Sequence, residues 1–343
     1  PGEFTQRAFL NERLDLAQAE AVGELIRARS ESGHRAALRR LEGGLSREVA
    51  LLRAPGLELL TRVEACLDHP GEDISSLGAD ALSAALEPAR RRALELAASQ
   101  QQGRLLAEGA RVAIVGRPNA GKSSLLNALL GFQRAIVRPE PGTTRDTLEE
   151  PLALDGGSAV LIDTAGIRSE GADPAEAEGV ERARRAIESC DLALFVLDGA
   201  RAPDASDEQL LSSVASSGRP VLTVLTKSDL CADSVRPESL RVSALTRSGL
   251  TELKAEISRR LGAQPVGDSD PIVISSLRHR ESLERFAREL ALAVQSPLTH
   301  GDEWEDRAAF HLRAALGALD EIVGAAAADE VLHQIFSKFC VGK

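Results

Sequence analysis

A segment that begins at residue 116 has the residue types and the spacing of a phosphate-binding loop, Gly116-x-x-x-x-Gly121-Lys122-Ser123. The two glycines let the backbone curl so that successive N–H groups and a helix N-terminus form a nest for phosphate oxygens. Lys122 is predicted to reach the β and γ phosphates, and the Ser123 hydroxyl is predicted to bind Mg²⁺. An apolar run, 112–115, precedes the loop and a helical pattern follows it, which is the context that this motif requires.

Two further segments carry oxygen ligands for the same metal ion. In Pro-Gly-Thr-Thr-Arg-Asp, Thr144 can place its hydroxyl on Mg²⁺ when a γ-phosphate orders the loop, which predicts a switch. Asp163 ends an apolar run, and a carboxylate at a strand tip can hold Mg²⁺ through water. Gly166 leaves a backbone amide for the γ-phosphate.

A third group of residues predicts that the base is guanine. Asp229 can accept hydrogen bonds from both N1–H and the N2 amino group, and adenine offers no such pair. The stem of Lys227 is expected to pack on the ring, and residues 243–245 to supply an amide to O6. The predicted nucleotide-binding residues are Asn119, Ala120, Gly121, Lys122, Ser123, Ser124, Gly142, Thr143, Thr144, Asp163, Gly166, Thr226, Lys227, Asp229, Ser243, Ala244 and Leu245.

Short apolar runs that alternate with helical patterns must position these residues. The expected strands are 112–115, 148–154, 159–162, 192–197, 221–225 and 240–242. Asp155-Gly156-Gly157 predicts a tight hairpin and therefore one antiparallel edge strand. The other runs alternate with helices, which predicts a mostly parallel sheet covered on both faces, with ligands at the carboxyl ends of its strands.

Both flanks of this α/β region have helical periodicity. Asn11 is expected to cap a helix start, and Pro55-Gly56 to interrupt the helices. We therefore expect a phosphate-loop domain, 107–264, inserted into one all-helical domain made of 1–106 and 265–343.

Composition limits the functions that this chain can have. Hydrophobic residues make up 43% of it but aromatic residues only 3%, so its cores must consist mainly of Leu, Val, Ile and Ala. No run approaches the ~20 apolar residues of a membrane helix, and the four cysteines lack paired or zinc-site spacing, so we expect a cytoplasmic protein without membrane contact. The net charge of -11 argues against wrapping nucleic acid by charge alone.

The chain resembles the MnmE (TrmE) family of tRNA modification GTPases along essentially its whole length. Its opening, PGEFTQRAFLNERLDLAQAEAV, is similar to the start of that family's central helical domain, and GRPNAGKSSLLNALL is typical of the family's phosphate loop. The final Phe339-Cys340-Val341-Gly342-Lys343 contains Cys-x-Gly-Lys, which generic GTPases lack.

The resemblance implies GTP hydrolysis in the modification of tRNA wobble uridine, of the carboxymethylaminomethyl type at C5. It further implies an FAD-dependent partner (MnmG or GidA), a homodimer, and a preceding domain that binds a folate derivative. The chain has no methionine, so we expect that Pro1 is not its natural start and that this domain is missing.

The resemblance also bears on catalysis. Ile167 stands where Ras-like enzymes have a water-orienting glutamine, so either the enzyme is slow or another group supplies that function. The family uses K⁺, and Asn119 matches its ligand. It also uses a glutamate in the second switch, for which Glu176 is the first choice and Glu178 the competitor. Cys340 is implicated in the modification chemistry, and a structural or docking role is the alternative.

Thr226 departs from the family, which has asparagine there, and we expect one lost hydrogen bond to guanine, about 1 kcal/mol. Two other functions remain open at this point. A ribosome-assembly GTPase of the Era or Der kind would require an RNA module or a second phosphate loop, and a nucleotide-regulated scaffold would not need hydrolysis.

Overall fold

The computed structural model describes residues 1–68, 79–131, 149–163, 185–230, 239–262, 271–299, 304–325, 329–337 and 339. The chain forms two compact units. The helical unit consists of Pro1–Ala28, Gly33–Ala107 and Gly267–Lys343, and the α/β unit of Arg29–Ser32 and Glu108–Val266. The main part of the α/β unit therefore interrupts the helical unit in the sequence.

The α/β unit is built on a sheet whose six described strands have the order β2-β3-β1-β4-β5-β6. They are β1 (Ala110–Val115), β2 (Glu149–Leu154), β3 (Gly157–Asp163), β4 (Leu192–Asp198), β5 (Val221–Thr226) and β6 (Leu240–Arg241). β2 pairs antiparallel with β3, and the other neighbours in this order pair in parallel. The predicted mostly parallel sheet with one antiparallel edge strand is confirmed.

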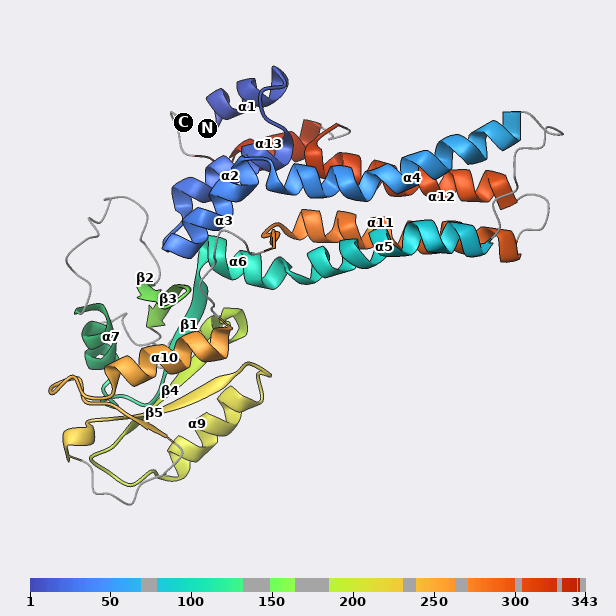
Figure 1. The fold of residues 1–343 in the computed structure, drawn as a ribbon. Coiled ribbons are helices and arrows are strands. Elements are labelled where there is room, and N and C mark those ends of the chain that lie inside the picture. The colour runs from blue at the N-terminus through green and yellow to red at the C-terminus, as the bar shows by residue number, and fades with distance from the viewer. Residues whose placement is uncertain are drawn as a thin grey trace. The chain divides into compact units, whose positions relative to one another are not determined.

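Helices cover this sheet on both faces, so its central strands are apolar and buried along most of their length. Six of the seven residues of β4 are buried. α9 (Ala205–Ala215) and α10 (Leu250–Leu261) lie on opposite sides of β4 and β5 (Figure 1). α7 (Lys122–Gly131) follows β1, and the short η1 (Ser228–Leu230) follows β5. The carboxyl ends of β1, β4 and β5 therefore lead directly into the predicted site.

Four long helices form the body of the helical unit. α4 (Gly44–Asp68) packs along α12 (Trp304–Val323), and α5 (Ala79–Ala98) along α11 (Leu277–Thr299) (Figure 1). Their shared core consists mainly of Leu, Val, Ile and Ala, with Phe286 as its fully buried aromatic residue. Among the described residues, no helix has the length and apolarity that crossing a bilayer requires.

Five shorter helices complete the described part of this unit and its junctions. They are α1 (Glu3–Leu10), α2 (Leu16–Arg27), α3 (Glu31–Leu41), α6 (Gln100–Glu108) and α13 (Asp329–Ser337). α2 packs against the end of the chain, because Leu16 and Ala19 share a buried cluster with Phe336 and Phe339.

The predicted cap at Asn11 is wrong. Asn11 ends α1, and its side-chain amide donates to the Arg7 carbonyl, 2.7 Å away. Asp15 begins α2 instead: its carboxylate accepts from the Gln18 N–H at 2.8 Å, and the Gln18 side chain accepts from the Asp15 N–H at 3.0 Å. This reciprocal pair satisfies two N–H groups that a helix start otherwise leaves open.

The predicted interruption at Pro55-Gly56 is also wrong, because both residues lie inside α4. Proline in a helix interior costs about 3 kcal/mol. Leu52, Leu59 and Val63 are buried on either side of it in the core shared with α12, and burying three such side chains outweighs that cost. The tertiary core therefore overrides the local signal.

Candidate nucleotide site

The phosphate loop joins β1 to α7, and the packing around its two glycines explains their spacing. A Cβ atom on Gly116 would lie 2.4 Å from the Val196 carbonyl oxygen of β4, so only glycine fits there. Gly121 has a φ of +88°, in the left-handed region that favours glycine. α7 begins at the next residue, which aims its N-terminus at the loop. This geometry fits phosphate oxygens.

Lys122 lies inside this loop. Its Nζ donates to the carbonyl oxygens of Gly116 and Arg117, both 2.7 Å away, and the side chain is buried. Ser123 and Ser124, on the first turn of α7, are exposed, as is Asn119 with a φ of 63°. The loop thus has a buried cation at its centre and exposed polar side chains at its rim.

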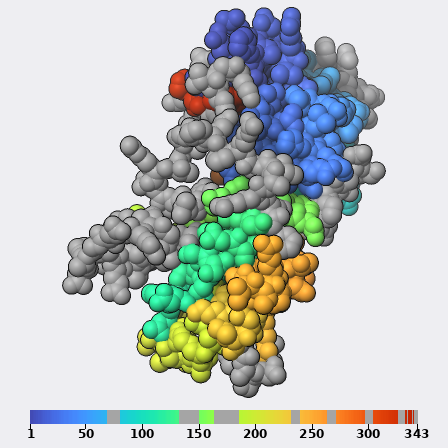
Figure 2. All heavy atoms as spheres, turned by 90° about the vertical axis from the view of Figure 1, so that its left-hand side faces the viewer, coloured from blue at the N-terminus to red at the C-terminus, as the bar shows by residue number. Residues whose placement is uncertain are grey.

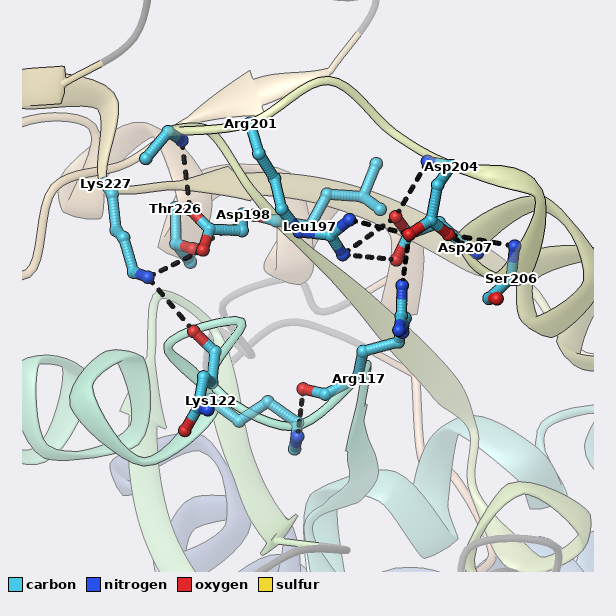
Figure 3. A network of polar contacts seen from close by, with 12 residues as sticks. Arg117, Lys122, Leu197, Asp198, Arg201, Asp204, Ser206, Asp207, Thr226 and Lys227 are labelled. Carbon is cyan, nitrogen blue, oxygen red and sulfur yellow. Dashed lines mark hydrogen bonds and ion pairs between the residues drawn. The ribbon is translucent and has the colours of Figure 1, made fainter.

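The tip of β5 binds the phosphate loop through two consecutive side chains (Figure 3). The buried Thr226 hydroxyl lies 2.6 Å from the Ala120 carbonyl oxygen and 3.0 Å from that of Leu197. Lys227 Nζ donates to the Asn119 carbonyl oxygen at 3.0 Å. The residues predicted to bind the base and those predicted to bind phosphate are therefore in direct contact.

Asp198, which we did not single out in the sequence, belongs to the same group. It ends β4, and its carboxylate accepts from Lys227 Nζ at 2.7 Å and from the Ala200 N–H at 2.9 Å. Burial raises the pKa of this carboxyl, but the hydrogen bonds and positive charge of Lys227 outweigh burial and lower its pKa overall. The signal that could have revealed it was an aspartate at the tip of an apolar run, as at Asp163.

Asp229 is exposed and is oriented by Ser243, which is fully buried after β6. The Ser243 hydroxyl donates to Asp229 Oδ1 at 2.5 Å and accepts from the Thr246 N–H at 3.1 Å. The Ser243 N–H itself donates to the Ser248 carbonyl at 3.0 Å. Ser243 therefore binds Asp229 through its hydroxyl, and its own N–H is already hydrogen-bonded within the loop. Ala244 and the exposed Leu245 are the next residues of the segment predicted to bind O6.

Arg117 connects the phosphate loop to the start of α9 (Figure 3). Its guanidinium lies 2.5 Å from Asp204, the N-cap of α9, which also pairs with Arg201 at 3.0 Å. The Asp207 and Ser206 N–H groups and Arg117 hold the pKa of Asp204 at about 2. Arg201 also pairs with the buried Asp207, at 2.9 Å.

Of the remaining predicted ligands, only the backbone of Asp163 lies within the described residues. The backbone of Asp163 ends β3, where it pairs in register with Ile114 of β1. Gly142, Thr143, Thr144, Gly166, Ile167, Glu176, Glu178 and Cys340 lie outside the described residues. In surface view, the teal part of the chain, which includes α7, lies beside the yellow part of the same unit (Figure 2).

The phosphate loop fits a magnesium ion that is bound mainly by phosphate oxygens. Such an ion needs few protein ligands, and the exposed Ser123 on the first turn of α7 offers a hydroxyl oxygen beside the loop. In the described part of the chain, no three His, Cys, Asp or Glu side chains gather as a self-contained metal site.

Comparison with known proteins identifies the family. The model of the MnmE helical domain matches residues 16–340. The chain belongs to the MnmE family. The MnmE protein of Heliobacterium modesticaldum, named a tRNA modification GTPase, is 45% identical over the whole chain, which spans 76% of that relative. The MnmE protein of Thermus thermophilus, with the same name, is 43% identical over the whole chain, which spans 74% of it.

Among solved structures, the G domain of the T. maritima FeoB iron transporter is 28% identical, and the match covers 44% of this chain and 98% of that domain with a TM-score of 0.35. The fold assignment rests instead on this chain's own strand order and phosphate loop.

Proposed function

We propose that this chain hydrolyses GTP as part of tRNA wobble uridine modification. One observation carries the proposal. Thr226 and Lys227, at the end of β5, hydrogen-bond to the phosphate loop. Asp229, which is predicted to recognise guanine, follows them directly in η1 and is oriented by Ser243. The names of the two MnmE relatives support both the nucleotide and the tRNA.

Each predicted site residue has a role in the proposed reaction. Lys122 would neutralise charge on the β and γ phosphates, and Ser123 and Asp163 would hold Mg²⁺, with Thr144 as the switch ligand. Bound Mg²⁺ would neutralise charge on the phosphate oxygens. Asp229, oriented by Ser243, selects guanine.

Potassium is the second part of the proposal. Ile167 cannot orient water, so we infer that K⁺ supplies charge stabilisation beside the β and γ phosphates. The Asn119 backbone is held by Lys227 while the residue is exposed at the loop rim, which suits its side chain to bind that ion. Glu176 is the proposed second-switch carboxylate, and Glu178 is the alternative.

A GTPase assay tests the nucleotide and potassium roles together. We expect faster GTP hydrolysis in KCl than in NaCl, and we expect Asn119→Ala to remove the difference. Asn127→Ala, on the exposed face of α7, is the matched control and should keep it. Equal rates of the unsubstituted chain in the two salts would contradict the potassium role, and no GTP turnover would contradict the enzyme itself.

The partners follow from the same proposal. We propose that the protein acts in the cytoplasm as a homodimer with FAD-dependent MnmG (GidA), which contributes most of the tRNA-binding charge because this chain has a net charge of -11. Cys340 is proposed to take part in the modification chemistry.

The tRNA role has its own test, on the full-length protein with its partner. Cys340→Ser should abolish the modification of wobble uridine and leave GTP turnover intact. Cys190→Ser is the control, because Cys190 is fully buried in the core of the α/β unit and is unrelated to the terminal motif. Normal modification by the Cys340 variant would assign that residue a docking or structural role.

A further inference from the structure

An aromatic cluster in the helical unit holds the chain near its C-terminal end. Phe339 lies two residues beyond the end of α13 and is nevertheless only 8% exposed. Its ring centroid lies 5.6 Å from that of Phe336, which in turn lies 6.4 Å from that of Phe9 in α1. Three of the eight phenylalanines of the chain therefore gather here, in a protein whose cores are mainly aliphatic.

Two glycines leave the space that the Phe339 ring occupies. A Cβ atom on Gly23, inside α2, would lie 3.3 Å from Cζ at the tip of this ring. A Cβ atom on Gly2, which precedes α1, would lie 3.1 Å from Phe339 Cγ. Both distances are shorter than the optimal carbon–carbon contact of about 3.5 to 4.0 Å. Gly2, Gly23 and the Phe336 ring together form the Phe339 seat.

The backbone also directs Phe339 into this seat. The Phe339 N–H donates to the Phe336 carbonyl at 3.1 Å, so the chain turns directly after α13 ends. The fully buried Leu16 and Ala19 of α2 belong to the same apolar cluster. Because removing this ring from water is favourable, the seat fixes a part of the chain that lies beyond the last described helix.

We propose that Phe339 is a positioning residue for tRNA modification, because it fixes the chain immediately before Cys340. This inference rests on the proposed role of Cys340 in that chemistry and adds the element that locates its thiol. Without the seat, Cys340 would be tethered at Ser337, the last residue of α13, and three extended residues span about 10 Å. With Phe339 seated, the tether is one residue, about 3.8 Å between Cα atoms.

The length of the tether sets how often the thiol is correctly placed. Because volume grows as the cube of the reach, the longer tether opens roughly ten times the volume or more to Cys340. The fraction of time that the thiol spends at the reacting position should fall by a similar factor. The contribution of the seat is thus to orientation, which affects kcat for modification and leaves tRNA binding unchanged.

Phe339→Ala in the full-length protein with its partner tests this proposal. We expect kcat for tRNA modification to fall about tenfold, with the KM for tRNA and the rate of GTP hydrolysis unchanged. Phe339→Leu should recover most of kcat, because an apolar side chain again fills the seat. Phe310→Ala removes a 62% exposed ring from α12 and is the matched control, which should keep kcat.

A substitution in α2 tests the same contact from the other side. Gly23→Ala places a methyl group against the ring and should lower kcat several-fold, although alanine favours a helix more than glycine does. Combined with Phe339→Ala, it should have no further effect, because the ring that it displaces is absent. Gly317→Ala in α12 is the control, since its added Cβ would meet no atom within 4 Å.

A nitroxide label on Cys340 measures the anchoring independently of activity. The labelled chain carries Cys66→Ser and Cys231→Ser and keeps Cys190, which is fully buried. In this chain Phe339→Ala should narrow the lines of the electron paramagnetic resonance spectrum, because the label gains mobility. The spectrum should not change with the exposed-ring control.

Three results would overturn the inference. An equal loss of GTP hydrolysis and of modification in Phe339→Ala, or an unchanged label spectrum, would make the role of Phe339 merely structural. Normal modification by Phe339→Ala, where Cys340→Ser is inactive, would overturn the positioning role alone. Normal modification by Cys340→Ser would instead overturn the proposed role of that cysteine, and the positioning role with it.

Discussion

The helical unit and the α/β unit both bury charged side chains, and the pairs between helices of the helical unit contrast with the contacts of Lys122 in the α/β unit. In the helical unit, Arg40 pairs with Glu24, and Glu20 lies 3.1 Å from Arg278 and 2.8 Å from His279. These pairs join side chains on different helices. In the α/β unit, by contrast, Lys122 donates to main-chain carbonyls of its own loop.

The two kinds of contact have different consequences for stability and for ligand binding. Side-chain pairs between helices fix the packing of those helices, and breaking one leaves an uncompensated buried charge. Donors to loop carbonyls instead fix the direction of individual peptides, which matters for a ligand more than for the fold. We therefore expect substitutions in the first network to change stability and substitutions in the second to change nucleotide binding.

The largest expected effect on stability is that of Glu24→Ala. Arg40 is 3% exposed and would lose its carboxylate partner, which should lower the free energy of unfolding by about 3 to 5 kcal/mol. Urea denaturation measures this. Glu3→Ala removes an exposed pair with Arg7 and is the matched control, with an expected loss below about 0.5 kcal/mol. Similar losses in the free energy of unfolding for both variants would show that the buried pair stabilises the helical unit no more than the exposed pair does, which would contradict this prediction.

Lys122→Ala should greatly reduce catalysis and change stability little, which is the opposite of the expectation for Glu24→Ala. It removes the cation proposed to contact the β and γ phosphates, and kcat/KM for GTP should fall about 10² to 10³-fold. The free energy of unfolding should change by less than about 1 kcal/mol, because a largely buried charge is removed along with its hydrogen bonds. Lys254→Ala on α10 is the control for both measurements. A large loss of stability with normal kcat/KM would refute this assignment.

Glu20→Gln tests the helical network through pH. Burial alone would raise the pKa of Glu20, but the charges and hydrogen bonds of His279 and Arg278 lower it from 4.5 to about 2. A lowered carboxyl pKa stabilises the fold above about pH 4.5, and this stabilisation is lost as the pH falls towards 2.

The free energy of unfolding of the unsubstituted chain should thus exceed that of Glu20→Gln by roughly 3 kcal/mol at most between pH 5 and 7. This difference should shrink as the pH falls below 4.5. Urea denaturation across this range measures it, with the exposed Glu58→Gln of α4 as a control. A difference that grows towards low pH would contradict the role of the Glu20 charge.

Arg117→Ala should have the smallest effect. Arg117 is 36% exposed and Asp204 47% exposed, so loss of this pair should cost less than about 1 kcal/mol and less still in high salt. Arg201→Ala should cost more, because Asp207, 4% exposed at its side chain, would lose its charge partner. Thermal unfolding at two salt concentrations compares them, and a larger effect of Arg117→Ala would reverse the order.

Several features could be predicted from the sequence because their causes are local. The loop from Gly116 to Ser123 and the turn at Asp155-Gly156 depend on backbone preferences of neighbouring residues, and most of the strands depend on largely apolar runs. Asn11 failed as a helix start because Asp15, with Gln18 three residues later, is the stronger capping pair. That signal was present in the sequence and was overlooked.

The sequence alone therefore predicts the phosphate loop, the alternation of strands and helices, and most of the polar residues at the strand tips. It does not predict that α4 continues through Pro55, that Asp198 holds Lys227, or that Thr226 contacts the phosphate loop, which the folded structure shows. The reason is physical: these outcomes depend on contacts between segments far apart in the chain. Thr226 and Ala120 are separated by 106 positions, and no local preference can predict their hydrogen bond.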